Sequence, residues 1–495
     1  MTVAPAGSDL PSLDRLFEAE PDRLAQLTFD CAGIHFDWSK THLDQGWIAR
    51  MLERAGEANF TKARDALFSG GVVNSSEGRA ATHVAERGTG SSEAVDVASK
   101  RRMRMRALVD AVEAGAFGPV TAVLHIGIGG SVLGPALLVD ALGRQNRAYQ
   151  ARFLSNVDGL AFEDATRGLD PATTLVVAVS KTFTTSETLL NLQAALAWLR
   201  DSGVEDPDSR VIAVTAAAEA AVEAGVDDSR ILVFDEGVGG RYSLWSAVGF
   251  TAALSLGWDA FEELLEGAGE MDRHFRFAEP DANVPLIAAF ADRLYVEAAG
   301  CQTRALFAYD ERLRLLMPYL QQLEMESNGK RVTSAGQPVA HPTAPVTWGG
   351  TGTDAQHAVF QLLHQGTVLV PVEFVAVTTP EDRQDPGHHR LLLLNAFAQG
   401  AALMQGRTSD DPQRADPGNR PSATILLDRL DARTLGALIA FYEHRTFANA
   451  VLLGINPFDQ FGVELGKAIA HGLADGGGED GLDPSTKALI ERAGL

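Results

Sequence analysis

Cysteine is scarce in this sequence, and its scarcity excludes a disulfide-based scaffold. Only Cys31 and Cys301 occur among 495 residues, and neither has the neighbours of a cysteine metal site. Two distant thiols cannot build the framework that small secreted domains use in place of a large core. The composition therefore favours a reduced, intracellular setting.

Positive charge is also in short supply. Lysine and arginine number 42 against 65 aspartates and glutamates, so the formal net charge is −23. A surface this acidic repels nucleic acids and anionic lipids, and we expect neither as a partner. Any anionic substrate must be held by a local cluster of cations and backbone amides that works against the overall field.

No apolar run looks suited to crossing a membrane. Residues 119–139 contain no charged side chain, but four glycines and a proline interrupt the middle of the segment. A strand, a glycine turn and a helix explain this pattern better than a membrane span. The first 20 residues have neither a basic start nor an apolar stretch, so we expect no secretory signal and a cytoplasmic location.

The length and the apolar pattern predict a two-domain α/β protein. Single cores stop growing near about 250–300 residues. Short runs rich in Val, Ile and Leu alternate with helical stretches from residue 120, and the alternation recurs after residue 300. Such runs are typical of parallel strands covered on both faces, which predicts two doubly wound sheets. We expect a mainly helical segment at 1–100 packed on the second domain, a first α/β domain at 101–262, and a second at 263–495 that ends in a helical arm.

Two motifs follow predicted strands and suit an anion. The first is GIGGS, from Gly127 to Ser131, where backbone amides and a helix N-terminus can meet a phosphate. A dinucleotide fingerprint requires glycine at position 132, which is Val132 here, so NAD binding is disfavoured. A tight turn without a ligand remains the alternative.

The second motif is SKTFTTSET at 180–188. The five hydroxyl side chains between Ser180 and Ser186, together with Lys181, gather where a helix is expected to begin. Hydroxyls, a cation and helix amides together suit phosphate or sulfate. Ordinary N-capping would require only one of these hydroxyls, so anion binding is the preferred interpretation.

Two further motifs carry charge into turns. In GVGGRYSLWSAVG, Arg241 follows a glycine pair, which lets its backbone approach a ligand; a surface arginine at a turn is the alternative. In QQLEMESNGK, Glu326 lies where a helix runs into a turn. The helix dipole disfavours a carboxylate there, which suits a general base, although most glutamates at helix ends are simply solvated.

The remaining motifs are weak when taken alone. His357 and His364 are seven residues apart and share a helix face, but no third metal ligand is spaced to join them. Core packing is the usual fate of such a histidine. Lys467 in FGVELGKAIA does not belong to a Walker loop, because only three residues separate the glycines and no Ser or Thr follows the lysine.

Taken together and in this order, the motifs resemble the motif series of the phosphoglucose isomerase family, from GIGGS at residue 127 to NPFDQFGVELGKAIA ending at residue 470. The resemblance implies two sugar-isomerase (SIS-type) domains, a homodimer, no metal and no cofactor. The implied activity is reversible aldose–ketose isomerisation of glucose 6-phosphate and fructose 6-phosphate in glycolysis and gluconeogenesis.

The resemblance also implies individual roles. Glu326 matches the base, Arg241 the arginine beside the enediol, and His357 and Lys467 the pair assigned to ring opening. The counterpart of His357 reaches across the dimer interface, which implies shared active sites. The positions that match substrate or phosphate contacts are Gly130, Ser131, Ser180, Lys181, Thr182, Thr185, Gln322 and Gln460.

The chain departs from the family pattern at Val132, where aspartate is frequent, and at Gly350-Thr351, where a Glu-Pro pair is usual. Two alternatives stay open at this stage. A non-catalytic sugar-phosphate sensor could use the same fold, although it would not need Glu326 or Arg241. An isomerase that also accepts mannose 6-phosphate is compatible with the same residues.

Overall fold

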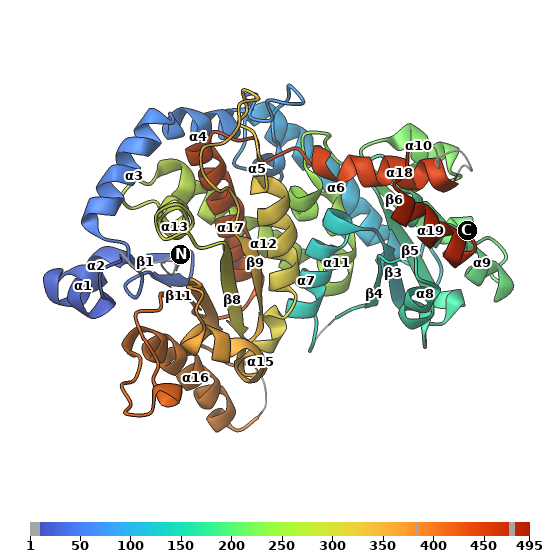
Figure 1. Ribbon diagram of the computed structural model, residues 1–495. Helices are drawn as coiled ribbons and strands as arrows, with labels where there is room; N and C mark the ends of the chain where they lie inside the picture. Colours follow the sequence, from blue (N-terminus) through green and yellow to red (C-terminus); the bar gives the residue numbers. More distant parts are fainter. Residues whose placement is uncertain (1–9, 146, 382–383, 475–480) are drawn as a thin grey trace. The chain divides into compact units, whose positions relative to one another are not determined.

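The computed structural model describes residues 10–145, 147–381, 384–474 and 481–495 (Figure 1). The chain forms two compact units, Met1–Pro457 and Phe458–Leu495. The first contains both sheets. The second contains α18 (Glu464–Ala474) and α19 (Pro484–Ala493). Among the described residues, every helix is too short or too polar to span a bilayer.

A five-stranded parallel sheet follows the first apolar alternation. Its strand order is β4-β3-β5-β6-β7, with β4 (Gln150–Leu154), β3 (Ala122–Ile126), β5 (Thr174–Val179), β6 (Val211–Thr215) and β7 (Ile231–Val233). Every residue of β3, β5 and β6 is buried, as expected for strands covered on both faces. One face packs on α8 (Gly159–Thr166), α9 (Ser186–Asp201) and α10 (Ala218–Glu223). The other face lies towards α6 (Ser92–Glu113), α7 (Leu133–Leu142) and α11 (Phe250–Leu256) (Figure 1).

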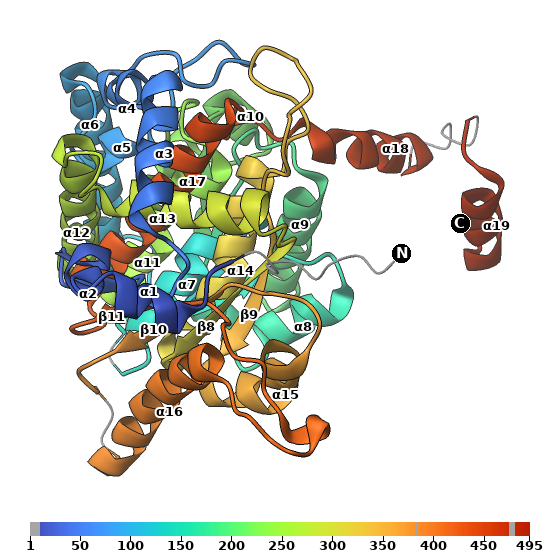
Figure 2. The same cartoon turned by 60° about the vertical axis from the view of Figure 1, so that its left-hand side comes forward.

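A six-stranded sheet holds the second alternation. Four parallel strands, β11 (Ser422–Leu427), β10 (Val372–Val377), β8 (Thr303–Tyr309) and β9 (Val346–Thr351), lie in that order. The hairpin of β1 (Thr28–Cys31) and β2 (Ile34–Asp37) extends this sheet, with β2 antiparallel to β11. Figure 2 shows α15 (Gly352–Gln365) and α16 (Pro386–Gln405) on one side of the sheet. The other side carries α13 (Val284–Arg293) and α17 (Ala432–Leu453).

The N-terminal segment is mainly helical in its described residues, and it also contains the unpredicted β1–β2 hairpin. Its helices before α6 are α1 (Leu13–Ala19), α2 (Arg23–Leu27), α3 (Gln45–Glu57), α4 (Phe60–Ser69) and α5 (His83–Glu86). The hairpin stacks Phe36 on Trp38 and packs Phe36 against Phe441 of α17. This part of the segment therefore belongs to the core of the second sheet.

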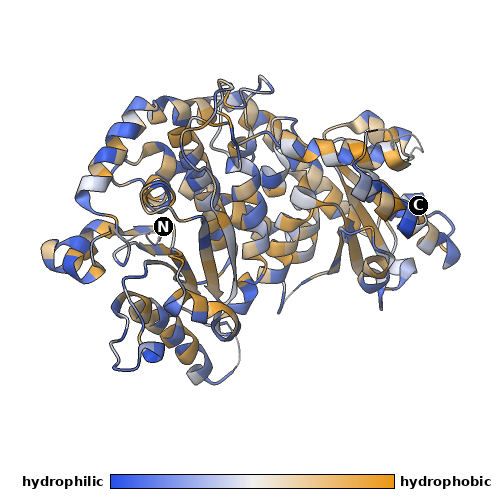
Figure 3. Ribbon diagram, viewed as in Figure 1, coloured by the Kyte–Doolittle hydropathy of each residue, from blue (hydrophilic) through white to orange (hydrophobic). Residues whose placement is uncertain are grey.

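The strands of both sheets are mostly hydrophobic in Figure 3, and α17 is buried along nearly its whole length. This helix packs against α12 (Trp258–Phe277) and α13, and it carries Glu443, His444 and Arg445 into the interior. Charged groups at such depth require partners, because an unpaired buried charge is costly. Those partners support the candidate site described next.

Candidate active site

The glycine turn after β3 is shaped by close packing. A Cβ added to Gly130 would lie 2.1 Å from the carbonyl carbon of Gly240 and 2.6 Å from the amide nitrogen of Arg241. A side chain at Gly130 would therefore push the two turns apart. One added to Gly129 would lie 2.9 Å from Nε2 of Gln322. The turn thus brings together two predicted positions, Gln322 and Arg241, that lie far apart in the sequence.

A buried histidine holds this turn from below. Nε2 of His125 lies 2.7 Å from the carbonyl oxygen of Ser131, and Nδ1 lies 2.8 Å from Oγ1 of Thr251. Because a carbonyl can only accept, Nε2 carries the proton and Nδ1 accepts from the threonine hydroxyl. Burial lowers the pKa of His125 to about 4, so the ring is neutral near pH 7. Sequence reasoning missed this residue, although its position at the end of a predicted strand was a usable signal.

The hydroxyl loop after β5 leads into α9. Oγ of Ser180 lies 3.0 Å from Oγ1 of Thr185, and Oγ1 of Thr182 lies 2.8 Å from Oγ1 of Thr184. Thr185 is the N-cap of α9, yet its side chain makes no capping hydrogen bond. Side-chain capping at Thr185 therefore does not explain these hydroxyls, and the positive end of the helix dipole remains able to attract an anion.

Phe183 takes an unusual conformation within this loop. Its φ is 53°, in the left-handed region that bulky residues rarely adopt, and its side chain is buried. Such strain persists only where the surroundings fix it, and it is concentrated at functional sites. The buried ring thus locks the neighbouring hydroxyls in place.

The two anion motifs meet at the crossover of the five-stranded sheet. β3 and β5 are neighbours, and the chain leaves them in opposite directions to reach β4 and β6. Ligands of open α/β sheets bind outside the carboxyl ends of strands at such a point. GIGGS follows β3 and SKTFTTSET follows β5, so both predicted motifs lie at the carboxyl ends where such a ligand is expected.

Lys181 faces a neighbouring turn. Its Nζ donates to the carbonyl oxygens of Glu236 (2.7 Å) and Val238 (3.1 Å). Burial, with a smaller effect of Arg79, lowers the pKa of Lys181 to about 8, so it remains mostly protonated at pH 7. Lys181 therefore ties the hydroxyl loop to the segment that leads to Arg241 and keeps one N–H for a ligand.

Arg241 and Glu326 form the charged centre of the site. Arg241 is 2% exposed, and its Nη1 lies 3.5 Å from Oε2 of Glu326, whose side chain is 23% exposed. Nε of Arg241 also donates to Oγ of Ser327 at 2.6 Å. Arg241 is therefore not a surface arginine, and Glu326 is not fully solvated. A carboxylate that is open on one side and faces a buried guanidinium can exchange a proton with a ligand.

Glu326 ends a π-helix, η9 (Gln321–Glu326), that follows α14 (Leu316–Leu320). The preceding acidic residue, Glu324, pairs with Arg304 of β8 and accepts from Thr347 at 3.0 Å. π-Helical turns are rare and are frequent at functional sites. The wide turn lets Glu324 point into the core while Glu326 remains at the surface.

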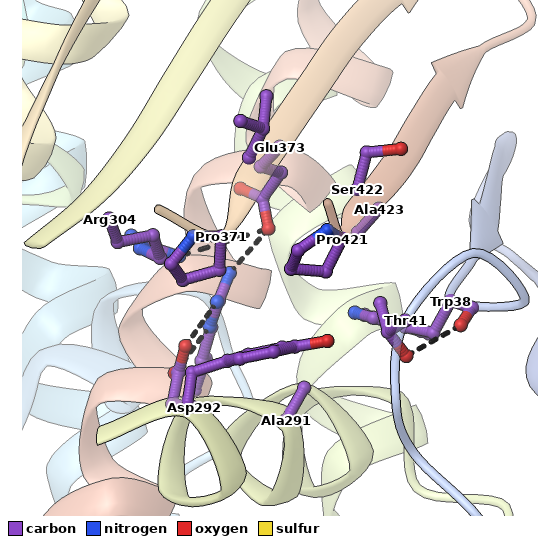
Figure 4. A pocket seen from close by; sticks show the side chains of 13 residues that line it. Trp38, Thr41, Ala291, Asp292, Arg304, Pro371, Glu373, Pro421, Ser422 and Ala423 are labelled. Atoms are coloured by element: carbon purple, nitrogen blue, oxygen red, sulfur yellow. Dashed lines mark hydrogen bonds and ion pairs between the residues drawn. The ribbon is translucent and has the colours of Figure 1, made fainter. Parts of the chain in front are cut away.

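A buried ion cluster lies under this turn. Figure 4 shows Asp292, Arg304 and Glu373 around a cavity of about 20 Å³. Arg445 bridges them, 2.6 Å from Asp292 and 2.7 Å from Glu373. When Glu324 is included, three acids share two arginines, Arg304 and Arg445. Through the Glu324–Arg304 pair, the cluster holds the π-helical turn that ends at Glu326.

A second buried network holds the arginine turn, η5 (Gly240–Trp245). Nε1 of Trp245 donates to Glu443 at 2.8 Å, and Arg87 pairs with both Glu443 and Asp272. Burial raises the pKa of Glu443 to about 7. The network joins α5, α12 and α17 to the segment that carries Arg241, and sequence reasoning identified none of its members.

The other predicted residues lie on different elements. His357 is exposed on α15, whereas His364 is partly buried and lies 2.9 Å from Oε1 of Gln399. Gln460 and Lys467 belong to the second unit, with Lys467 exposed on α18. Among the described residues, no three His, Cys, Asp or Glu side chains are grouped as metal ligands.

With this geometry in place, comparison with known proteins decides the family. A model described as phosphoglucose isomerase matches residues 37–490. The chain belongs to the phosphoglucose isomerase family. A phosphoglucose isomerase family relative named glucose-6-phosphate isomerase, from Rhizorhabdus wittichii, is 64% identical over 482 residues, which cover 97% of this chain and 96% of the relative.

The phosphoglucose isomerase assignment is supported at greater distance too. The relative from Zymomonas mobilis, also named glucose-6-phosphate isomerase, is 56% identical over 97% of this chain and 95% of its own length. The crystal structure of a glucose-6-phosphate isomerase from Chlamydia trachomatis has a TM-score of 0.88 at 29% identity, covering 98% of this chain and 96% of that one. The predicted family and α/β fold class are confirmed.

Proposed function

We propose that this protein is a cytoplasmic glucose-6-phosphate isomerase that interconverts glucose 6-phosphate and fructose 6-phosphate without a cofactor. The observation that carries the proposal is the Arg241–Glu326 pair, 3.5 Å apart, beside an anion crevice built from two loops. The names of the relatives agree with it, and so does an aldose–ketose reaction that needs one proton carrier and one anion stabiliser.

Glu326 acts as the base. In the open-chain aldose it removes the proton from the second carbon, which gives an enediolate, and the hydroxyl proton of the second carbon passes to the oxygen of the first carbon. The same carboxyl group then returns the proton to the first carbon. Positioned proton transfer of this kind contributes on the order of 10²–10⁴-fold. Arg241 stabilises the negative charge that develops on the enediol oxygens, from a buried position that needs little reorganisation.

The sugar phosphate occupies the crevice between the two loops. Hydroxyls of Ser180, Thr182 and Thr185, the amides of the glycine turn and the α9 N-terminus supply the donors, with Lys181 nearby. These contacts lie away from the reacting carbons. Their binding energy therefore orients the substrate for proton transfer.

Ring opening falls to His357 and Lys467, and we propose that the sites are shared in a homodimer. His357 is exposed on α15, where a second chain can reach it. The arm exposes large apolar side chains, including Phe461, Leu465 and Ile469, which is typical of interaction surfaces. Gln322 and Gln460 are the proposed sugar contacts.

Subunit mixing tests the shared site. Glu326→Gln chains and His357→Ala chains, each inactive alone, are allowed to exchange. A shared site leaves one intact site in each mixed dimer, so activity returns to a substantial fraction of wild type. If the mixture stays inactive although exchange is confirmed by mass spectrometry, each site lies within one chain.

The activity itself is tested with purified protein in a coupled assay. Glucose 6-phosphate and mannose 6-phosphate are compared as substrates, each with and without a chelator. We expect rapid turnover of glucose 6-phosphate that the chelator leaves unchanged. The absence of turnover, with fructose 6-phosphate still bound, would support the sensor alternative, and loss of activity restored by a divalent ion would contradict a metal-free reaction.

A further inference from the structure

A second pocket lies behind the turn that carries Arg241. It encloses about 240 Å³ and is bounded by α5, the first half of α6 and Asp235. The volume is below that of pockets for drug-sized ligands, which begin near about 300 Å³. Small residues in the lining leave this space open, namely Gly70, Ala80, Ala85, Ala94 and Ala98.

Glu86 gives this pocket its chemical character. The residue is only 5% exposed, lines the pocket, and accepts no side-chain hydrogen bond from any residue that the structure describes. Burial raises the pKa of Glu86 to about 7, while the charges of Arg101 and Arg102 on α6 oppose this rise. A buried carboxyl group without a donor is costly and calls for a partner.

The rest of the lining is acidic. Glu93 and Asp235 add two carboxylates. The single arginine of the lining, Arg101, already pairs with Asp235 at 2.8 Å. With Glu86 ionised, the lining carries three negative charges and one positive charge, and Arg102, which also acts on Glu86, still leaves an excess of negative charge. The pocket therefore favours a cation over an anion or a neutral ligand.

Asp235 in the pocket wall begins the loop 235–241, which leads to Arg241. Asp235 accepts from the amide of Gly237 at 2.8 Å and from the Thr82 hydroxyl at 3.1 Å. The same short loop supplies the carbonyls that hold Lys181 and then reaches Arg241. A ligand that changes how Arg101 pairs with Asp235 consequently acts on the loop between two residues of the substrate site.

We propose that this pocket binds a small organic monocation, a primary ammonium or an amidinium group, on the carboxylate of Glu86, and that its occupancy changes substrate affinity through loop 235–241. The binding part stands on the pocket alone. The part about substrate affinity rests on the proposed isomerase function.

Calorimetric titration with butylammonium chloride tests binding, and 1-butanol serves as the uncharged probe of similar shape. We expect saturable binding of butylammonium at pH 8 and none of 1-butanol. Glu86→Gln, which preserves shape, should weaken binding at least about tenfold, whereas Glu93→Gln at the exposed rim should weaken it less. Equal affinity of the wild type and Glu86→Gln, or no saturable binding to wild type, would overturn the proposal.

The pH dependence adds an independent check. Arg101 and Arg102 on α6 and Asp235 beyond β7 are the charged groups that act on Glu86. Butylammonium binding should be weaker at pH 6 than at pH 8, because Glu86 is then largely protonated. A pH-independent affinity would contradict Glu86 as the partner.

The coupling is tested with fructose 6-phosphate. Saturating butylammonium should change the KM of the wild type at least about twofold and leave that of Glu86→Gln unchanged. Tetramethylammonium chloride, whose nitrogen carries no hydrogen to donate, is the salt control. If the KM of the wild type is unchanged, the proposed effect on substrate affinity is wrong, whereas the proposed binding of the cation is judged by calorimetry alone. Calorimetry needs no turnover, so failure of the isomerase assignment would be recognised separately.

Discussion

The two sheets share a strand order and use it differently. In each, the first parallel strand along the chain lies between the second and the third: β4-β3-β5 in one sheet and β9-β8-β10 in the other. Both therefore have a crossover where a ligand crevice is expected. At the first, hydroxyls and backbone amides are available. At the second, residues after β8 and β10 line a hollow of about 380 Å³, but Arg312 pairs there with Asp310 and Glu381.

The comparison shows that topology offers a site and local chemistry decides whether it is used. At the first crossover the loop hydroxyls pair with one another and not with a charged acceptor, so they could also donate to an anion. In the second, ion pairs already satisfy the arginines. The proposed base, Glu326, ends the π-helix between β8 and β9, next to buried charges. The proposed function thus divides binding and proton transfer between the two sheets.

The largest effect should come from removing the base. Glu326→Gln should lower kcat by at least about 10²-fold while fructose 6-phosphate still binds, because the amide cannot carry the proton. Glu311→Gln, in the second crevice, is the matched control and should retain wild-type kcat. More than about a tenth of the wild-type rate in Glu326→Gln would place the base elsewhere.

The next largest effect should come from breaking the Arg304–Glu324 ion pair next to Glu326. Arg304→Met leaves Glu324 buried without its partner, and breaking such a pair costs about 3–5 kcal/mol of folding free energy. Thermal unfolding measures this loss. Glu324→Gln keeps a hydrogen-bonding group, and it should lower kcat severalfold with KM nearly constant. A change confined to KM would show that this cluster does not position Glu326.

Changes in the proposed phosphate-binding loop should affect KM and not kcat. Replacing Thr182 and Thr185 together by valine removes two donors to the phosphate, each worth about 1.5–3 kcal/mol with a charged group. KM should rise at least about tenfold, and so should the inhibition constant of inorganic phosphate. Replacing Thr121 and Thr173, a hydrogen-bonded threonine pair away from the crevice, by valine should change neither constant. If the phosphate inhibition constant of the Thr182/Thr185 variant is unaltered, the anion binds elsewhere.

A smaller effect is expected beneath the glycine turn. His125→Phe keeps a ring but leaves the carbonyl of Ser131 and the hydroxyl of Thr251 without a partner. The phosphate inhibition constant should rise about threefold, and the variant should lose about 1–3 kcal/mol of stability. His125→Gln, which can still donate, should recover part of both losses. If His125→Phe and His125→Gln have the same phosphate inhibition constant and stability, the hydrogen bond from His125 to Ser131 does not position the glycine turn.

The smallest effect concerns Glu86. Burial raises its folded-state pKa to about 7 from an ordinary value of 4.5. The folded state therefore binds the extra proton between these values, and stability is lost as pH rises through 7. Glu86→Gln should melt a few degrees above wild type at pH 8 and no higher at pH 5. The same gain at both pH values would show that ionisation of Glu86 is not its cause.

The sequence predicted most of the architecture because buried parallel strands are nearly continuous apolar runs. It missed β9, whose Gly349 and Gly350 weaken any strand pattern. A Cβ added to Gly349 would lie 1.8 Å from the carbonyl oxygen of Leu306, so close pairing with β8 requires glycine there. The β1–β2 hairpin was also missed, because its four-residue strands are stabilised by a partner nearly 400 residues away.

The candidate site could be predicted in part. Residues in local motifs, such as the hydroxyl loop and Glu326, were found from their neighbours in sequence. Arg304, Glu443 and His125 were not, because their importance comes from contacts that only the fold creates. Lys181 was predicted from its motif, but its attachment to the carbonyls of Glu236 and Val238 could not be foreseen. The proposed domain boundaries and the assignment of His357 and Lys467 to one shared site stay predictions.

Phe183 has a consequence for anyone who wishes to engineer this enzyme for heat resistance. Its left-handed backbone is held by a side chain that belongs to the hydrophobic core of the first domain. Core redesign around Leu192 or Val226 would therefore also alter the loop that is proposed to bind the substrate phosphate. A library selected only for survival at high temperature would drift in substrate affinity, and Phe183→Gly would separate the two properties by releasing the loop from the core.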